Sequence, residues 1–381
     1  MIPVIEYLKW RGDLSFTVSA PNEIDALIFS ELSYIPFDDL VPEFEFDEPV
    51  SLKTVGEEFF KLHGEDFSLG AIIPKEILSL FKVAISSERY SRVMVWGYVN
   101  ELCLDSEKQF SAVAFSLETG VTYVTYRGTD DTLVGWKEDL NMALFMPIPA
   151  QIRGAEYLES VARLSRDKLV VIGHSKGGNI AVYSALKTNP KIKKRIESVY
   201  SFDGPGFSED FVKSCKNDII VPKIKTVLPS RAIIGRIFDI IGEYKIVKST
   251  EKGLQQHNAL TWSLNGPEFA EAECFEKQSD NFHILLKTWV SKMTQKEKED
   301  FVSSFYKIIT SNDANTLTDI SAQKLKFILA MLKSEGKSKR TVISGVFKLI
   351  KEKNALSSSQ KKEIKKQKSI AKSNKNKEKT S

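Results

Sequence analysis

Gly173, Ser175 and Gly177 form a G-x-S-x-G pattern within the segment GHSKGG. A serine hydroxyl is a weak nucleophile, so it needs a base that takes its proton and a turn that holds it clear of other side chains. The two glycines leave room for a strained turn, and Gly178 lets a following helix pack close to neighbouring strands. The alternative is a glycine-rich strand-to-helix turn whose serine does no chemistry.

The segments on both sides of this turn have the periodicity that the pattern requires. Leu169–Ile172 is a short apolar run, typical of a parallel strand that is buried on both faces. After the glycines, apolar and small residues at helical spacing predict a helix that continues to Lys187. The amide of Lys176, at the helix start, is placed to bind an oxyanion where the helix dipole also favours negative charge. We therefore predict that Ser175 is a nucleophile.

Length and cysteine content set the outer limits. A chain of 381 residues is long enough for one large domain and an accessory piece. Its three cysteines are few, odd in number and unclustered, which argues against a disulfide framework or a zinc site and fits a reducing, cytoplasmic compartment. The first residues carry charges from Glu6 onward and show no cleavage site, so we expect no signal peptide, and no stretch is apolar enough to span a bilayer.

Charge is unevenly distributed along the chain. Residues 351–381 hold eleven lysines and three glutamates, a charge of +8, so residues 1–350 carry −4 of the total of +4. A mildly acidic body does not support a nucleic-acid role, and no specific nucleic acid is expected as a partner. Residues 356–381 are low in complexity and almost without apolar groups, which predicts disorder. This tail is either simply solvated or attracted to anionic lipid or RNA.

The N-terminal half contains three predicted helices followed by three predicted strands. The helices are expected at Asn22–Leu40, with Asn22 as N-cap, and at Ser51–His63 and Pro74–Ser87. The strands should form an antiparallel meander, and they are expected at Arg92–Val99, Phe110–Leu117 and Val121–Arg127. A turn at 127–131 and a short helix follow the last strand, and a longer helix is expected over 150–164.

Two motifs, YRGTDDTLVGWKEDL and VIGHSKGGNIA, resemble the core of the class 3 lipase group of α/β-hydrolases. In that group an F-R-G-T/S turn precedes a G-H-S-x-G-G elbow, and the two motifs stand here in that order. Four further segments resemble a little-characterised family of lipase-like proteins without an agreed substrate: YLKWRGDLSF, NEIDALIFSELSYIPF, YSFDGPGF and LQQHNALTW. The resemblance covers about residues 5–290 and implies a mostly parallel sheet flanked by helices.

The resemblance also implies an oxyanion hole. By it, Thr129 matches the turn residue that supplies one donor, and Lys176 supplies the other. A turn threonine bonded to its own backbone is an equal alternative. Arg127 is expected to be structural and to pair with a nearby carboxylate: Asp130, Asp131 or Asp139.

Two aspartates compete for the acid of a triad. Asp203 stands at the C-terminal end of the predicted strand Ser198–Asp203, at the sheet edge where catalytic groups of open α/β sheets gather. The next predicted strand, Lys223–Leu228, ends without the carboxylate that lipases usually have there. We favour Asp203, although it could serve only as a helix cap, and the alternatives are that Asp239 reaches in or that the site lacks an acid.

His257 is the preferred base. It lies in the loop after the predicted last core strand, Tyr244–Ser249, and completes the order Ser, Asp, His of α/β-hydrolases. His283 falls inside a predicted helix over 281–290, where a lone histidine is usually packed or capping. His174 precedes the nucleophile, and we expect it to point away from the pocket and support the turn.

Three segments leave their roles open. Residues 141–149 are apolar with two prolines, and they form a lid, an acyl-binding wall or a buried connection. Arg231–Gly242 is an apolar amphipathic stretch that packs on the body, covers the serine or meets lipid. From residue 294 the pattern predicts a helical extension with helices near Gln295–Thr310, 321–332 and 338–353.

These observations predict an α/β-hydrolase domain over 1–293, a helical extension over 294–355 and the tail over 356–381. Its reaction would be acyl transfer from a carboxylic ester or acyl lipid to water, with Ser175, His257 and Asp203 as the triad and Lys176 and Thr129 as oxyanion donors. This chemistry needs no metal or cofactor. The alternatives are a non-catalytic binding or regulatory protein of the same fold, and a membrane-associated protein that meets anionic lipid through the tail.

Overall fold

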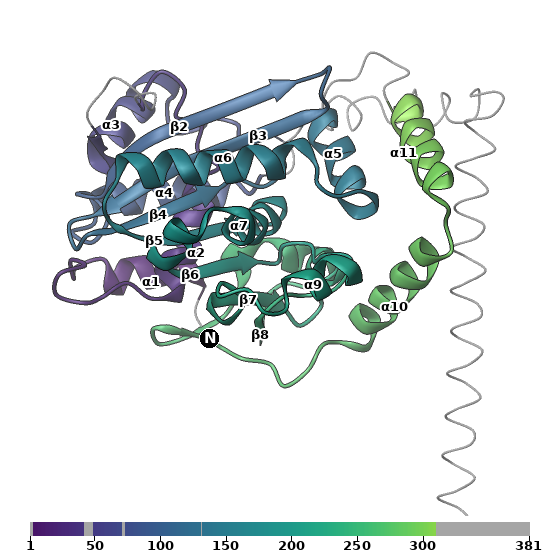
Figure 1. Cartoon of the computed structure of the whole chain (residues 1–381). Coiled ribbons are helices and arrows are strands. Elements are labelled where there is room, and N and C mark those ends of the chain that lie inside the picture. Colours follow the sequence, from purple (N-terminus) through teal and green to yellow (C-terminus); the bar gives the residue numbers. More distant parts are fainter. Residues whose placement is uncertain (1–2, 42–48, 71–72, 131, 310–381) are drawn as a thin grey trace, which may run out of the picture.

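The computed structural model describes residues 3–41, 49–70, 73–130 and 132–309 of the chain. Its centre is a sheet of eight strands that lie side by side in sequence order, from β1 to β8 (Figure 1). The first four strands pair antiparallel: β1 (Val50–Ser51), β2 (Met94–Cys103), β3 (Lys108–Leu117) and β4 (Val121–Tyr126). The remaining strands continue from β4 in parallel: β5 (Lys168–His174), β6 (Ile196–Phe202), β7 (Ile224–Pro229) and β8 (Glu243–Val247). The predicted meander and the later strands are thus confirmed.

Helices cover both faces of this sheet. One face is covered by α6 (Pro149–Leu164) and α7 (Lys176–Lys187), which pack on each other and on the central strands. The other face is covered mainly by α2 (Glu23–Leu32), which packs on β4 and β5, with α1 (Val4–Arg11), α3 (Leu52–His63) and α4 (Glu76–Ser86) around it. Two separate hydrophobic clusters fill the layers. A mixed, mostly parallel sheet between two helical layers is an α/β-hydrolase-like fold.

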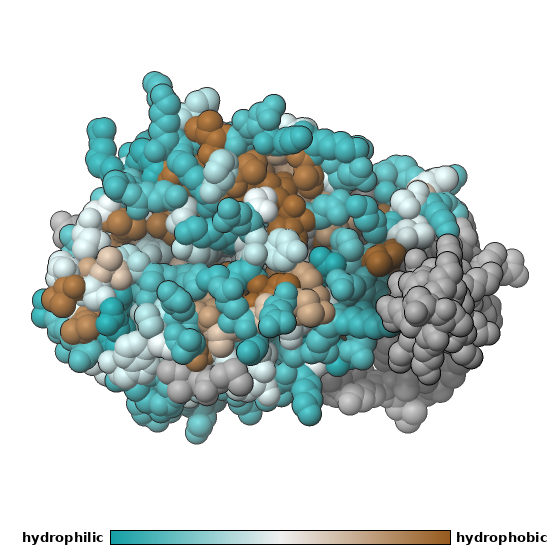
Figure 2. All heavy atoms as spheres, turned by 90° about the horizontal axis from the view of Figure 1, so that it is seen from below, coloured by the Kyte–Doolittle hydropathy of each residue, from teal (hydrophilic) through white to brown (hydrophobic). Residues whose placement is uncertain are grey.

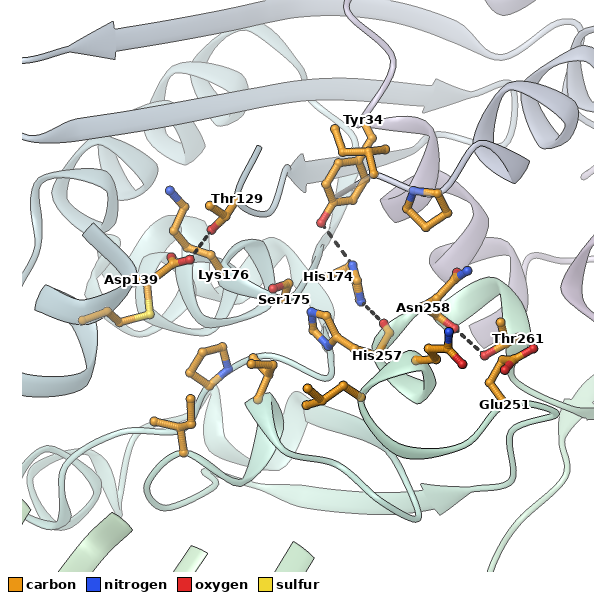
Figure 3. A pocket seen from close by; sticks show the side chains of 18 of the residues that line it. Tyr34, Thr129, Asp139, His174, Ser175, Lys176, Glu251, His257, Asn258 and Thr261 are labelled. Carbon is orange, nitrogen blue, oxygen red and sulfur yellow. Dashed lines mark hydrogen bonds between the residues drawn. The ribbon is translucent and has the colours of Figure 1, made fainter. Parts of the chain in front are cut away.

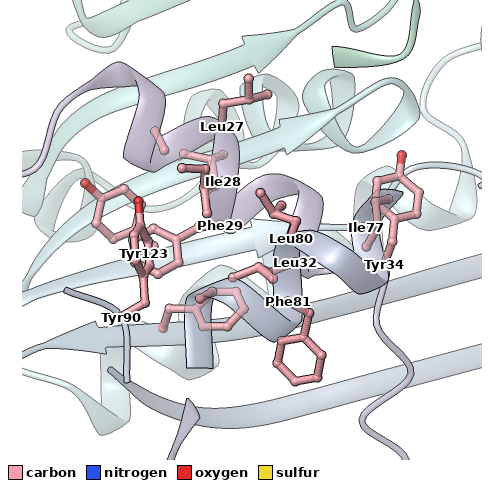
Figure 4. Packing of buried hydrophobic residues seen from close by; sticks show 14 of the residues in the cluster. Leu27, Ile28, Phe29, Leu32, Tyr34, Ile77, Leu80, Phe81, Tyr90 and Tyr123 are labelled. Carbon is pink, nitrogen blue, oxygen red and sulfur yellow. The ribbon is translucent and has the colours of Figure 1, made fainter. Parts of the chain in front are cut away.

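The helix α2 is almost entirely buried, and its residues interlock with rings from the sheet (Figure 4). Phe29 stacks on Phe115 with ring centroids 5.1 Å apart and lies 4.7 Å from the ring of Tyr123. Asn22 caps the helix as predicted, since its side chain accepts from the amide of Asp25 at 3.1 Å. The helix ends at Leu32, earlier than the predicted Leu40, because a proline follows four residues later and disfavours helical backbone before it.

A buried ion pair joins α2 to the segment after α4. The guanidinium of Arg89 donates to both carboxylate oxygens of Asp25, at 2.7 and 2.8 Å, and neither side chain is exposed. Tyr90 and Tyr7 donate to the same carboxylate, and Arg89 also donates to three backbone carbonyls. We call Tyr7, Asp25, Arg89 and Tyr90 the N-terminal anchor. Its hydrogen bonds join α1, α2 and the segment after α4 to one another.

The other helices agree with the sequence to different degrees. The predicted Ser51–His63 and Pro74–Ser87 correspond to α3 and α4, and the hydroxyl of Ser51 caps α3 by accepting from the amide of Thr54. The short helix expected after the turn at 127–131 is α5 (Leu133–Leu144), which runs on into the apolar segment 141–149. Between α7 and β7 the chain forms two short helices, α8 (Pro190–Arg195) and α9 (Glu209–Cys215).

The C-terminal part adds α10 (Lys277–Ser291) and α11 (Gln295–Ile309), which packs against α5. These helices confirm the predictions for 281–290 and for Gln295–Thr310. The predicted helices at 321–332 and 338–353 and the tail over 356–381 lie outside the described residues. The apolar segment Arg231–Gly242 holds a 3₁₀ turn, η2 (Ile234–Arg236), and its backbone bonds to the loop that follows β6.

Hydrophobic surface is divided into separate groups. On the face seen in Figure 2, hydrophobic patches alternate with hydrophilic side chains. Large apolar residues with substantial exposure come from distant parts of the chain and include Trp10, Leu104, Leu254 and Ile284. Within the described ranges, every helix falls short of the length and apolar content needed to cross a membrane.

Candidate active site

Ser175 stands at a sharp turn between β5 and α7. Its backbone has φ 57° and ψ −131°, a conformation that is strained for a residue with a side chain. The turn is held by its own amide, which donates to the carbonyl of Phe202 at 2.9 Å. A Cβ atom at Gly173 would collide with the backbone of Gly177, so the two glycines are required by close approach. This geometry is that of a nucleophile elbow.

Asp203 follows directly after β6, the strand beside the elbow. Its backbone is also left-handed, with φ 47°, and its amide donates to the carbonyl of Val227 on β7. One carboxylate oxygen is 2.6 Å from Nδ1 of His257, and the other accepts from the amide of Gly235 at 3.1 Å. Burial raises the pKa of Asp203, although the hydrogen bond from His257 opposes this shift.

His257 lies at the end of the 3₁₀ turn η3 (Gly253–His257), beyond β8. Because Asp203 accepts from its Nδ1, the other ring nitrogen, Nε2, is left to act as a base. His257 and Ser175 line the same pocket, and Figure 3 shows them as neighbours there. The structure therefore brings together the three residues that the sequence singled out, although they are up to 82 residues apart in the chain.

The competing candidates have other partners. The carboxylate of Asp239 is 2.8 Å from Nζ of Lys287 on α10. His283, on the same helix, donates from Nδ1 to the carbonyl of Arg236 at 2.8 Å. Of the two candidate aspartates, Asp203 after β6 is therefore the one that contacts His257.

The turn after β4 packs directly on the elbow. A Cβ atom at Gly128 would lie 3.1 Å from Cβ of Ser175, so this glycine allows the turn to approach the serine. Thr129 lines the pocket, and its hydroxyl donates to Asp139 at 2.7 Å rather than to its own backbone. Burial raises the pKa of Asp139 to about 6. Arg127 pairs with Asp130 at 2.9 Å, as expected for a structural arginine.

The sequence assigns Lys176 a role only through its backbone amide. In the structure its side chain is also buried, with 1% exposed. Its ammonium group donates to the carbonyl of Gln109 at 2.9 Å and to the carboxylate of Glu138 at 3.1 Å. Glu138 is fully buried and accepts from two backbone amides as well. This ion pair fixes the start of α7 to β3 and α5, beside the turn that carries Thr129. In the sequence, this ion pair is indicated only by the lysine next to Ser175, and nothing there gives the lysine side chain a role.

His174 is placed differently from the prediction. It lines the pocket instead of pointing away from it, and its Nε2 lies 2.8 Å from the backbone carbonyl of His257. It does support the turn, because the two imidazole rings are only 4.7 Å apart. Tyr34 is the second partner of His174, with its hydroxyl 3.1 Å from Nδ1. Tyr34 belongs to the segment NEIDALIFSELSYIPF. The sequence does not indicate its contact with His174, because 140 residues separate the two.

The pocket has a volume of about 970 Å³. Several polar side chains line it, whereas much of its wall is apolar. Helices α10 and α11 contribute a large part of this wall: Phe282, Leu286, Trp289, Val290 and Phe301. Ile234 and Ile237, around η2, line another side, so the segment Arg231–Gly242 both packs on the body and borders the serine.

The apolar segment 141–149 contributes less than expected. Of its residues, Met142 lines the pocket, whereas Met146 packs against the hydrophobic cluster beneath α6. The segment is therefore mainly a connection between α5 and α6, in which Met142 and Ile148 are buried and Pro147 is exposed. The apolar wall of the site comes instead from helices that the sequence pattern assigned to the end of the main domain and to an extension.

Comparisons with solved structures return lipases at low identity. An M37 lipase is 15% identical with a TM-score of 0.34, over 56% of this chain and 68% of that one. A Rhizomucor miehei lipase with its propeptide is 16% identical with a TM-score of 0.33, over 42% of this chain and 58% of that one. A fungal lipase in complex with an inhibitor is 13% identical with a TM-score of 0.36, over 65% and 80%. No curated protein matches the chain.

The sequence itself matches one family model. The match covers residues 84–307, which is more than half of the chain. It begins within α4, spans the meander, the elbow and all three residues of the Ser-His-Asp constellation, and ends within α11. It follows that the chain belongs to the Mbeg1-like family.

Proposed function

We propose that this chain is a serine hydrolase that cleaves carboxylic esters, with acyl lipids as the substrate class. The observation that carries the proposal is the pair Asp203 and His257, joined at 2.6 Å, with His257 lining the same pocket as a strained Ser175. A serine that stands at an elbow beside an oriented imidazole is the arrangement that acyl transfer requires.

In the first half of the reaction, Nε2 of His257 takes the proton of Ser175 as Oγ attacks the ester carbonyl. Asp203 accepts from Nδ1, which stabilises the imidazolium that forms. The carbonyl oxygen becomes negative, and we assign its stabilisation to the backbone amides of Lys176 and Thr129. His257 then donates the proton to the leaving alcohol, and an acyl-serine remains.

In the second half, water replaces the alcohol. His257 takes a proton from the water as it attacks the acyl carbonyl, and returns it to Oγ of Ser175 when the acid leaves. The apolar wall formed by α10, α11 and η2 would accommodate the acyl chain, because burial of methylene groups is favourable there. The apolar wall therefore indicates the class of substrate, an acyl lipid.

The partners and the compartment are proposals of the same kind. Cys103, Cys215 and Cys274 are free thiols, which supports a reducing location such as the cytoplasm. The lysine-rich tail over 356–381 supports peripheral contact with anionic membranes, since clustered lysines are attracted to a negative surface. Loss of sedimentation with anionic vesicles at low salt after deletion of this tail would support the second proposal.

The proposal is tested by labelling the purified protein with a fluorophosphonate. Wild type should be labelled, whereas Ser175→Ala and His257→Ala should not, because the probe reacts only with an activated serine. His283→Ala is the matched control, since His283 bonds to a loop carbonyl and should leave labelling intact. A folded wild type that resists labelling and hydrolyses no ester from short to long chains would overturn the proposal and favour a non-catalytic binding protein.

A further inference from the structure

Two residues of the motif NEIDALIFSELSYIPF reach the active site from the opposite face of the sheet. Glu31, near the end of α2, is 1% exposed, and Tyr34 follows it by one helical turn. Both line the pocket that holds Ser175, and neither has a role in the mechanism above. A carboxyl group in this position is unexpected, because burial disfavours its charged form.

The hydrogen bonds of His174 fix its tautomer. A backbone carbonyl can only accept, so Nε2 of His174 must carry the proton that it donates to His257. A neutral imidazole then has a bare Nδ1, which must accept from the hydroxyl of Tyr34. Burial and the nearby His257 lower the pKa of His174 well below its ordinary range, so the ring is neutral.

Glu31 faces the same nitrogen. One of its oxygens, Oε1, is 3.5 Å from Nδ1 of His174 and has no hydrogen-bond partner among the described residues. A carboxylate there would compete for a proton on Nδ1, whereas a neutral carboxyl would not. Desolvation raises the pKa of Glu31 to about 8, which keeps it neutral at neutral pH.

We propose that Tyr34 and Glu31 are positioning residues that act through His174, by holding the proton on Nε2 so that His174 anchors the backbone of His257. The anchor matters because His257 must keep one ring nitrogen on Asp203 and the other toward Ser175 at once. His174 fixes the backbone carbonyl of His257 and also lies against its ring, so a displaced His174 would release both. This inference rests on the proposed function, since it assigns His257 as the base.

Other charged groups lie around this cluster. Glu31 meets Tyr34 from its own segment and His174 from the end of β5, and the ring of His257 from η3 lies against that of His174. Arg127 and Asp139 act on Tyr34 from the turn after β4 and from α5. Arg127 already pairs with Asp130, and Asp139 accepts from Thr129. Glu31 is therefore the acid that stands closest to His174 among the groups that the structure describes.

Ionisation of Glu31 has a defined consequence. The carboxyl loses its proton to water, and the imidazole proton of His174 moves from Nε2 to Nδ1, where it is donated to the new carboxylate. Nε2 then presents a lone pair to the carbonyl oxygen of His257, and this contact is repulsive. The loop that carries His257 is released, so turnover should fall as pH rises through about 8.

The first test compares the ratio of kcat at pH 9 to kcat at pH 7 for ester hydrolysis. In wild type the ratio should be about one tenth, because a group with a pKa of about 8 is about 90% ionised at pH 9. In Glu31→Gln, which cannot ionise, the ratio should approach one. Glu23 lies on the same helix and pairs with Lys245, and neither residue lines the pocket. Glu23→Gln should therefore keep the wild-type ratio.

A second variant extends the kinetic test, and a spectroscopic measurement makes the inference independent of activity. Tyr34→Phe should lower kcat about fivefold to tenfold with little change in KM, since it removes one hydrogen bond to Nδ1 and leaves the ring. Imidazole ¹⁵N spectra should show His174 protonated on Nε2 at pH 7, with the proton moving to Nδ1 above pH 8 in wild type only. Only four histidines are present, so assignment by single substitutions is practical.

The outcomes separate the two proposals. Spectra that show the expected tautomer in a protein without hydrolase activity would retain the positioning role and reject the catalytic one. A proton on Nδ1 of His174 at pH 7 would overturn the inference, as would a Glu31→Gln variant that is folded by circular dichroism and keeps the wild-type loss of kcat at pH 9.

Discussion

Buried carboxyl groups differ in their hydrogen-bond partners between the N-terminal anchor and the pocket. In the anchor, Asp25 accepts from Arg89 and from two tyrosines, so its charge is compensated without water. At the pocket, Glu31 and Asp139 each keep one buried oxygen without a hydrogen-bond partner, within the part of the chain that is described. Complete pairing makes the anchor a structural element. Incomplete pairing leaves the pocket with groups whose protonation can change.

The largest effect should come from breaking the pair that orients the base. Asp203→Asn should lower kcat by about 10⁴, because an amide favours the wrong tautomer of His257. Asp239→Asn is the matched control, since Asp239 bonds to Lys287 and should leave kcat within about twofold. Steady-state kinetics on a short-chain ester measures both. Equal losses in the two variants would show that Asp203 is not the acid of this site.

The anchor should respond in stability instead of in catalysis. Asp25→Asn leaves the buried charge of Arg89 without its counterion, which should cost about 3–5 kcal/mol of unfolding free energy. Denaturant unfolding measures this loss, and kcat per folded molecule should stay the same. If Asp25→Asn has the unfolding free energy of wild type, the anchor is not the structural element that distinguishes it from the pocket.

Glu31→Gln should raise the free energy of unfolding at pH 8, whereas Asp25→Asn should lower it. The folded pKa of Glu31, about 8, lies above its ordinary value of 4.5, so the unfolded chain ionises first and stability is lost as pH rises from about 4.5 to 8. The glutamine variant avoids this loss and should be more stable than wild type at pH 8 by about 1–3 kcal/mol. Below pH 4 the difference should vanish. Chemical denaturation at both pH values decides the matter, and a less stable variant at pH 8 would contradict the assignment.

The smallest effect concerns the apolar wall. Trp289→Ala should lower kcat/KM for long-chain esters about tenfold relative to short ones, because it removes apolar contact area from the pocket. Phe145→Ser is the comparison, since the segment 141–149 is mostly a connection, and its chain-length profile should stay that of wild type. The reverse result would restore that segment as the acyl-binding wall.

The sequence was most informative where local pattern and local structure coincide. The strands β2 to β8, the turn at Ser175 and the cap at Asn22 depend on neighbouring residues, and the sequence predicts them correctly, whereas the two-residue strand β1 is not predicted. Asp203 and His257 could be selected because parallel strands bring their carboxyl ends to one edge. In the structure Asp203 contacts His257, whereas Asp239 and His283 bond to Lys287 and to the carbonyl of Arg236, a distinction that the pattern alone could not make.

What the sequence concealed depends on contacts across the layers. Nothing near Tyr34 or Glu31 in the chain indicates that they meet His174, because α2 lies on one face of the sheet and reaches the site past the end of β5. The buried side chain of Lys176 and the wall formed by α10 and α11 are hidden for the same reason. A helix that looks amphipathic gives no indication of the element it covers.

The contacts of His174 also bear on the order in which the protein is made. They join residue 34 to residue 174 and residue 174 to residue 257, so most of the domain must be synthesised before the base can be seated. A nascent chain that ends before η3 contains the elbow serine but neither His257 nor its loop. On the proposed function, the growing polypeptide should therefore remain inert toward esters on the ribosome until η3 has been made, and hydrolytic activity should arise only when His257 is seated beside Asp203.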